Sequence, residues 1–315
     1  MGMRRLSDGC EFAPVAAKDT ATLFGAPLLH HAALDLEAAS RITYRVEQRF
    51  RYTYEAPVTA LSQRLVVVPR ARHGDLYRRA HHVKVTGTAS RQRTHRDPAG
   101  NTVVRITAAR VEHSVEFGIA AVLERVCRPG WPVLPAHTLD DPTLRQPTPL
   151  TAADDRLRQM AADLVRPGGD GLDVAERICT AVCAALTYEY GVTNVATTAA
   201  EALAAGRGVC QDAAHIMVAV CRQAGLAARY VSGHLLGQGG THAWVEVIVP
   251  HRDAAVAVPF DPCHGRRTDH RYVTVAVGRD YADVAPTSGS YVGPPGGHLT
   301  STRQVGIISL DSPSI

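Results

Sequence analysis

Long apolar runs are missing from this sequence, and the longest that occur are far too short to span a bilayer. A secretory segment is also missing, because Arg4 and Arg5 are not followed by an uninterrupted apolar stretch. Pro27 and the pair His30-His31 interrupt residues 23–34. We therefore expect no membrane contact, and the cytoplasm is the default location.

The cysteines do not form a disulfide pattern. Their number is odd, and the seven positions are scattered along the chain: Cys10, Cys127, Cys179, Cys183, Cys210, Cys221 and Cys263. Small disulfide frameworks use even numbers at close spacings, so this usage favours a reducing compartment.

Several motifs that define large enzyme classes are also lacking. The chain has no phosphate-binding loop, no dinucleotide fingerprint and no Gly-x-Ser-x-Gly elbow. It has no Cys-x2-Cys pair and no His-Glu-x-x-His helix, although Cys179 and Cys183 are four residues apart and Cys263 adjoins His264. We interpret the helix cysteines as core residues, and we expect no metal site and no cofactor.

Positive charge is concentrated in one region. The net charge is +4, but residues 41–110 hold fifteen Lys and Arg against four Asp and Glu, a net of +11. Arginines on solvated strand faces would explain this. A docking surface for an acidic partner is the sharper alternative. Nucleic acid is not expected as a partner, because no recognised binding motif accompanies the charge.

Periodicity divides the chain into five parts. Residues 1–40 lack firm periodicity and are interpreted as an extension that is either disordered or the product of an upstream start site. Short alternating segments over 41–127 predict an antiparallel β sandwich. Six prolines within 128–150 predict a linker, and helical and strand patterns over 151–285 predict a second domain. Residues 286–315 form a tail in which residues 304–310 could return as a strand.

One cysteine has the sequence surroundings of a nucleophile. In residues 206–215, Gly-Arg-Gly-Val-Cys-Gln-Asp-Ala-Ala-His, Cys210 stands where a glycine-rich loop should become a helix. The pattern predicts a helix from Cys210 to about Gln223, with Gly225 as its stop signal. Free backbone N–H groups and the positive end of the helix dipole favour a thiolate there.

A base and an orienting acid follow downstream. Residues 242–249 and 254–261 both read as strands, with residues 250–253 as the turn. A symmetrical hairpin with that turn places His242 directly across from Asp261, on one face of the sheet. The carboxylate would accept a hydrogen bond from one imidazole nitrogen and leave the other for a thiol.

These blocks, together with residues 44–58 and 271–284, resemble the bacterial transglutaminase-like (papain-like) superfamily with its N-terminal β domain. The resemblance covers roughly residues 41–300. It implies an α+β fold in which a β sandwich precedes a transglutaminase-like core, with the helix that carries the cysteine packed on an antiparallel sheet. It also implies Cys210 as nucleophile, His242 as general base and acid, and Asp261 as orienting acid.

Three positions depart from the family pattern. Cys263 and His264 follow Asp261-Pro262 where the family usually has Thr-Asn, and Ala213 replaces an aromatic residue. The strand that leads to Asp261 also lacks a frequent tryptophan. All members of the expected triad are retained, so these departures concern substrate positioning more than chemistry.

Other site assignments remain open. A second oxyanion donor is needed beside the Cys210 backbone N–H, and Gln211, Tyr188 and Tyr190 are candidates. Trp244 shares a strand face with His242, where it packs against the imidazole or simply belongs to the core.

We expect thiol-dependent acyl transfer on peptide, isopeptide or glutamine amides, through a thioester. Hydrolysis by a cysteine peptidase or amidase is preferred. The alternatives are a protein-glutamine transglutaminase and a non-catalytic binding or scaffold module. The partners would then be a protein or peptide substrate and the acidic partner named above, in an oligomeric state that the sequence leaves open.

Overall fold

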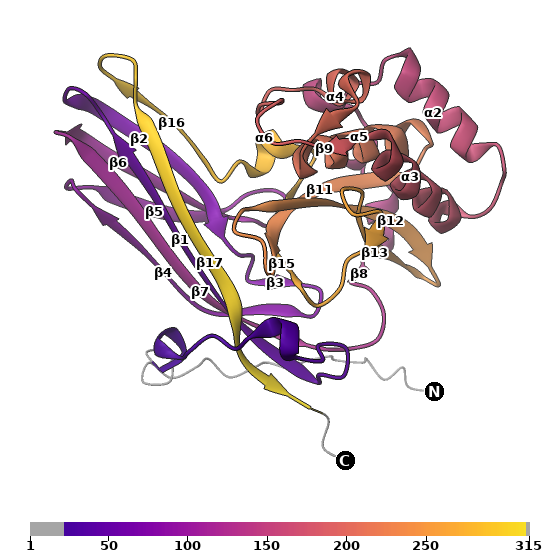
Figure 1. Cartoon of the computed structure of the whole chain (residues 1–315), viewed down its shortest axis with the longest axis horizontal. Helices are drawn as coiled ribbons and strands as arrows, with labels where there is room; N and C mark the ends of the chain where they lie inside the picture. The colour runs from indigo at the N-terminus through magenta and orange to yellow at the C-terminus, as the bar shows by residue number, and fades with distance from the viewer. Residues whose placement is uncertain (1–21, 313–315) are drawn as a thin grey trace, which may run out of the picture.

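The computed structural model describes residues 22–312, which form a β sandwich and a mixed core that lie side by side (Figure 1). The sandwich consists of β1 (Arg41–Thr53), β2 (Val58–Val68), β3 (Arg72–His73), β4 (Leu76–Thr86), β5 (Arg91–Arg96), β6 (Thr102–Val111), β7 (Ser114–Val126), β16 (Thr287–Val292) and β17 (His298–Asp311). The α+β class and the order of the two parts confirm the predicted fold.

The core contains all the longer helices. Its strands are β8 (Val133–Leu134), β9 (Thr187–Tyr188), β10 (Arg207–Gly208), β11 (Ala227–Leu235), β12 (His242–His251), β13 (Ala254–Asp261), β14 (Arg266–Arg267) and β15 (Tyr272–Gly278). Its helices are α2 (Asp155–Val165), α3 (Gly171–Ala185), α4 (Ala199–Ala205), α5 (Cys210–Gln223) and α6 (Tyr281–Val284). Short 3-10 turns are η1 (His31–Ala33), η2 (Ala136–Asp140), η3 (Pro142–Leu144) and η4 (Pro149–Thr151).

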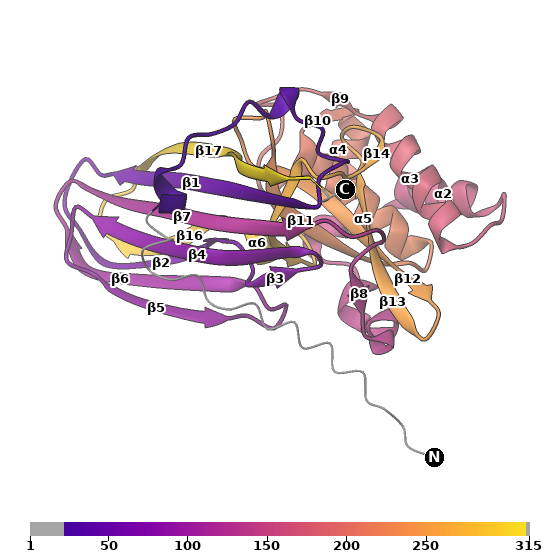
Figure 2. The same cartoon turned by 90° about the horizontal axis from the view of Figure 1, so that it is seen from below.

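Alternation of apolar and polar residues builds the sandwich. One sheet has the strand order β17-β1-β7-β4-β3, and the other has the order β16-β2-β6-β5. In β6, buried Val104 and Ile106 alternate with exposed residues, as expected of a strand with one face in the core. The two residues pack with Leu65 of their own sheet against Phe50 and Phe117 of the facing sheet. Figure 2 shows the strands of both sheets running along the long axis of the molecule, with the sandwich at one end and the helices of the core at the opposite end.

Both ends of the chain contribute to the sandwich. The predicted C-terminal tail supplies β16, which pairs with β2, and β17, which pairs with β1 along its whole length. Residues 1–21 of the predicted extension lie outside the described residues. In the rest of it, Leu36 and Ala39 are buried, and the Leu29 N–H donates to the Ile307 carbonyl over 2.8 Å. The second half of the extension therefore packs on the sandwich, because its apolar residues find a buried place there.

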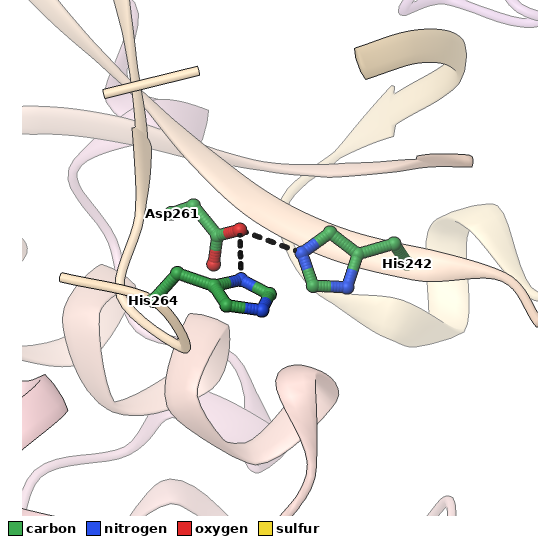
Figure 3. A group of neighbouring side chains, drawn as sticks. All are labelled: His242, Asp261 and His264. Atoms are coloured by element: carbon green, nitrogen blue, oxygen red, sulfur yellow. Dashed lines mark hydrogen bonds and ion pairs between the residues drawn. The ribbon is translucent and has the colours of Figure 1, made fainter. Parts of the chain in front are cut away.

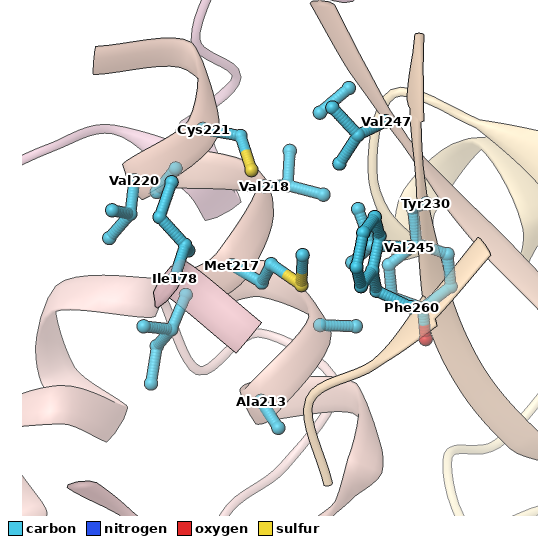
Figure 4. Close-up of a cluster of buried hydrophobic side chains, with 14 of the residues drawn as sticks. Ile178, Ala213, Met217, Val218, Val220, Cys221, Tyr230, Val245, Val247 and Phe260 are labelled. Carbon is cyan, nitrogen blue, oxygen red and sulfur yellow. The ribbon is translucent and has the colours of Figure 1, made fainter. Parts of the chain in front are cut away.

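A buried helix lies at the centre of the core. The core sheet has the order β14-β13-β12-β11-β15, and α5 packs on β11 and β12 while α2, α3 and α4 pack around it. Every residue of α5 from Asp212 to Arg222 is buried, so neighbouring elements cover the helix on all sides, including its polar residues Asp212, His215 and Arg222. Figure 4 shows this core, in which Met217 and Val218 point toward Val245 and Phe260 of the sheet.

The proline-rich segment 128–150 belongs to the core. β8 pairs with β13, and Leu134, Leu139 and Leu144 pack against Ile248 on the sheet. The segment predicted as a linker therefore covers one face of the core sheet. Two of its 3-10 turns, η3 and η4, begin with a proline, whose fixed φ suits the first position of a helical turn.

Specific polar contacts join the two parts. The Tyr44 hydroxyl donates to the His270 carbonyl over 2.7 Å, and His73 Nε2 lies 2.6 Å from the Glu246 carboxylate. Glu246, which is buried on β12, also binds Arg229 at 2.6 Å. Burial alone would raise the pKa of Glu246, but Arg229 and His73 hold it far below its usual range.

None of the helices in the described part of the chain has the length and apolar character needed to cross a membrane.

Candidate active site

Cys210 is the first residue of α5, directly after the short strand β10. Asp212 closes this start of the helix, because its Oδ2 accepts the Val209 N–H at 2.8 Å and the Thr193 hydroxyl at 2.7 Å. A Cβ on Gly208 would lie 2.6 Å from the same oxygen, so only glycine lets the loop pass so near. The predicted span of α5 is confirmed, and Gly225 follows it with φ +77°.

This placement gives the sulfur a favourable field. The backbone N–H groups of the first turn and the helix dipole point at Cys210 and stabilise a negative sulfur. Asp212 caps the helix, and burial raises the pKa of its carboxyl group, against the hydrogen bonds from Val209 and Thr193 that lower it.

His242 and Asp261 are in contact, although the predicted hairpin register is wrong. The observed partners are Val247 with Val258 and His251 with Ala254, so the turn is the two-residue loop Arg252-Asp253. Arg252 adopts φ +51°, as tight hairpin turns require.

Continuing the observed register puts Asp261 across from Trp244. The slip of two residues keeps His242 and Asp261 on the same face as diagonal neighbours, within reach of their side chains.

Asp261 is fully buried and surrounded by hydrogen-bond donors. One oxygen, Oδ2, accepts from His242 Nε2 at 2.7 Å and from His264 Nδ1 at 2.7 Å (Figure 3). The same oxygen accepts from the Tyr272 hydroxyl at 2.6 Å. The other oxygen accepts the Cys263 N–H at 3.0 Å. A carboxylate with four donors is held firmly in its ionised form.

The three residues of the expected triad meet at one point. Burial lowers the pKa of His242, but hydrogen bonds to Asp261 and to the Cys210 side chain outweigh it and raise the pKa to about 9. Burial raises the pKa of Asp261, yet the hydrogen bond from His242 and its charge bring the pKa to about 2. Because Asp261 engages Nε2, Nδ1 is the imidazole nitrogen left to interact with the Cys210 side chain. The arrangement can hold a proton on His242 beside a thiolate.

Trp244 lies behind the imidazole. It is 1% exposed, and its ring is stacked on that of His242 with centroids 6.2 Å apart. A side chain buried so deeply has no surface for substrate, so its contact fixes the orientation of His242 instead.

The three candidates for the second oxyanion donor differ in their contacts and exposure. Gln211 donates to the Asn194 carbonyl at 3.4 Å, and Tyr190 is 88% exposed. Tyr188 lies nearer, because β9 pairs with β10 just before the nucleophile. Burial raises the pKa of Tyr188, and the neighbouring Cys210 raises it further.

Two partners of Asp261 were not assigned from the sequence. His264 was noted only as a departure from the family pattern, although its position three residues after Asp261 is a signal that it could bind the same carboxylate. Tyr272 gave no local signal, because it comes from β15, which reaches the site only through the order of the strands.

Three residues of this site also have the composition of a metal site. His242, Asp261 and His264 place three possible ligand atoms within 4.8 Å of one another. Hydrogen bonds already join these atoms, and a metal there would remove His242 from proton transfer. Cys179 and Cys183 instead direct their thiols to backbone carbonyls, in line with a core role.

Family models match both parts of the chain. Residues 158–262 match the model of the transglutaminase-like superfamily, and residues 44–124 match that of the bacterial transglutaminase-like N-terminal region. Cys210, His242 and Asp261 all lie within the first match.

Similar proteins come from several bacteria. An uncharacterized protein of Mycobacterium tuberculosis is 28% identical over 82% of this chain and 90% of its own length. An uncharacterized protein of Mycobacterium leprae is 38% identical over 34% of this chain and 40% of its own. The crystal structure of a candidate cysteine protease from Cytophaga hutchinsonii superposes with a TM-score of 0.70 at 19% identity, covering 87% of this chain and 93% of that one. At that identity the likeness concerns the fold.

Proposed function

This chain belongs to the transglutaminase-like superfamily and carries the bacterial transglutaminase-like N-terminal region, and on that premise we propose that it is a thiol-dependent acyl-transfer enzyme. The observation that carries the proposal is the contact of Cys210, at a helix start, with an imidazole that is held by a buried carboxylate. Its substrates would be peptide, isopeptide or glutamine amides.

In the first step the Cys210 proton moves to His242 Nδ1, and the thiolate attacks the amide carbonyl carbon. Asp261 stays ionised and stabilises the imidazolium through Nε2. The carbon–nitrogen bond then breaks as His242 returns its proton to the leaving amine, which leaves a thioester on Cys210.

The negative oxygen of the tetrahedral intermediate needs two donors. We assign the Cys210 backbone N–H as one of them. Tyr188 is the better choice for the second, since it lies beside the nucleophile while Gln211 is turned toward Asn194.

We propose hydrolysis as the second half-reaction. Cys210 is only partly buried, so water can reach a thioester on its sulfur and is the most abundant acceptor. His242 would take a proton from the water that attacks the thioester, and the thiol would then be released. An amine acceptor would make the enzyme a transglutaminase.

Mass spectrometry separates these outcomes. A glutamine-containing peptide library is incubated with the protein and with Cys210→Ala, with and without a primary amine. Hydrolysis produces cut peptides or glutamate products that depend on Cys210, and transamidation produces amine adducts. No reaction, combined with an inert Cys210, would instead support a scaffold module that retains the fold without turnover.

A row of arginines supports the acidic partner. On the face of the sandwich away from its core, Arg105 lies directly across from Arg93 on one side and from Arg64 on the other, and like charges placed in this way repel each other. Arg93 and Arg105 are exposed, whereas Arg64 is half-buried and donates to the Asp283 carbonyl at 2.9 Å. We propose that this face binds an acidic protein segment. Fluorescent hexaglutamate should bind in low salt and lose affinity with Arg93→Glu/Arg105→Glu; equal binding by that variant would refute this proposal.

The cytoplasm remains the predicted location. All six cysteines within residues 22–312 are free thiols, which supports a reducing compartment. Cell fractionation tests this prediction, and recovery outside the cytoplasm would contradict it.

A further inference from the structure

The segment between β9 and α4 exposes an unusual share of apolar side chains. Nine large apolar residues are exposed among residues 22–312, and four of them fall within the eight residues 188–195. They are Tyr188 (62%), Tyr190 (88%), Val192 (37%) and Val195 (57%). Single exposed apolar residues are ordinary, whereas a cluster marks a binding surface.

This cluster adjoins the nucleophile. Four hydrogen bonds tie residues 188–195 to the loop and first turn around Cys210. They are Glu189 N–H to the Gly208 carbonyl at 2.9 Å, Arg207 Nη1 to the Glu189 carboxylate at 3.4 Å, the Thr193 hydroxyl to Asp212 at 2.7 Å, and Gln211 Nε2 to the Asn194 carbonyl at 3.4 Å. Figure 1 shows β9 and α4 beside the start of α5. The exposed side chains therefore stand on a fixed backbone, as a recognition surface needs.

The surface also reaches the sandwich. Burial lowers the pKa of Arg303 on β17, and Tyr281 and Tyr190 partly offset this effect. Tyr190 is therefore within electrostatic range of Arg303 on β17. A peptide that crosses Cys210 would contact the apolar cluster on one side and could continue along the junction of the two parts.

We propose that residues 188–195 are the substrate-binding surface of the Cys210 site. The occupant is an extended peptide with an aromatic or branched aliphatic side chain next to the reacting carbonyl. Tyr190 and Val195 would cover that side chain and remove its apolar area from water. This inference rests on the proposed function, because it assumes that Cys210 reacts with the bound peptide.

Affinity alkylation tests the surface without a known substrate. N-iodoacetyl-phenylalanine amide and N-iodoacetyl-serine amide both alkylate a thiolate with loss of iodide, so they differ only in the side chain presented beside Cys210. The phenylalanine reagent should label Cys210 about tenfold faster and with saturation, the scale of discrimination that an apolar contact supplies. Labelling is measured by mass spectrometry on the folded protein.

Matched variants locate the preference. Tyr190→Ser/Val195→Ser should abolish the preference for phenylalanine and leave the rate with iodoacetamide unchanged. The control Val292→Ser/Leu299→Ser removes two other exposed apolar side chains, on β16 and β17, and should keep the preference.

Three outcomes would overturn the proposal. One is equal labelling by the two reagents, and another is a preference that survives Tyr190→Ser/Val195→Ser. The third is a dimer that this double variant dissociates, since the surface would then join two copies of the chain. If Cys210 resists even iodoacetamide, the proposed function fails first and this inference falls with it.

Discussion

Asp261 and Glu246 are two buried carboxylates of the same sheet, and they have different kinds of partner. Asp261, at the end of β13, binds two histidines and a tyrosine. Glu246, in the middle of β12, binds Arg229 and, across the junction with the sandwich, His73. Both carboxyl groups have lowered pKa values. Burial and a shifted pKa therefore do not by themselves identify an active site.

The chemistry of the partners makes the difference. The guanidinium of Arg229 is permanently charged, so Glu246 sits in a fixed ion pair that joins structural elements. The imidazole of His242 can gain and lose a proton, with a pKa raised to about 9, and its other nitrogen is left to interact with Cys210. We conclude that Glu246 holds the two parts of the molecule together, while Asp261 sets the protonation of the proposed base.

The largest expected effect is on stability, in Glu246→Gln. This change leaves the Arg229 cation buried without a counter-charge, which should lower the free energy of unfolding by about 3–5 kcal/mol. Urea unfolding at neutral pH measures it. Glu176→Gln, which breaks an exposed pair with Arg267, is the control and should lose less than about 1 kcal/mol. The iodoacetamide rate of Cys210 in folded Glu246→Gln should match that of the wild type; a large fall would mean that the two carboxylates are not separate in function.

The next effect is on proton affinity, in Asp261→Asn. Without the carboxylate, only Cys210 still opposes the effect of burial, so the pKa of His242 should fall clearly below about 9. NMR titration of the labelled imidazole measures the change. A pKa that stays near 9 would show that Asp261 does not control His242.

The same pair predicts a pH dependence of stability. A histidine whose pKa is raised on folding stabilises the protein fully below its unfolded value, and this contribution disappears as pH rises through the folded value. The difference in unfolding free energy between wild type and Asp261→Asn should thus be largest below about pH 6.5 and shrink as pH rises through about 9. Urea titrations across that range measure it, and a difference that grows with pH would have the wrong sign.

The smallest expected effect belongs to His264→Asn. Asp261 keeps its bonds from His242, Tyr272 and the Cys263 N–H, so we expect a loss of about 1 kcal/mol in unfolding free energy. The iodoacetamide rate of Cys210 should change less than in Asp261→Asn. A loss of Cys210 reactivity as large as that of Asp261→Asn would move His264 from a supporting contact into the proposed catalytic group.

Local sequence signals predicted the helix that begins at Cys210. Glycines before it, an apolar stretch and a stop at Gly225 are all short-range features, and each is present in the structure. The contact of His242 with Asp261 was also predicted, but with a register that was wrong by two residues. The contact survived because a slip of two keeps both side chains on one face, whereas a slip of one would have separated them.

Contacts between distant segments could not be predicted in this way. His73 and Glu246 are 173 residues apart, and only the docking of the sandwich on the core brings them together. Tyr272 reaches Asp261 because β15 joins the sheet beside β11, which no local pattern encodes. The proline-rich segment 128–150 was predicted as a linker for the same reason, because its leucines are buried only by packing on the sheet, which is formed by distant residues.

The most direct test of the central claim is the pH dependence of iodoacetamide labelling of Cys210, in wild type and in His242→Ala. The account predicts that Cys210 labels faster than the other six cysteines well below about pH 8.5, where an unperturbed cysteine thiol ionises, and that His242→Ala abolishes this advantage. Labelling of Cys210 at the rate of an ordinary thiol, with no change in His242→Ala, would contradict the account.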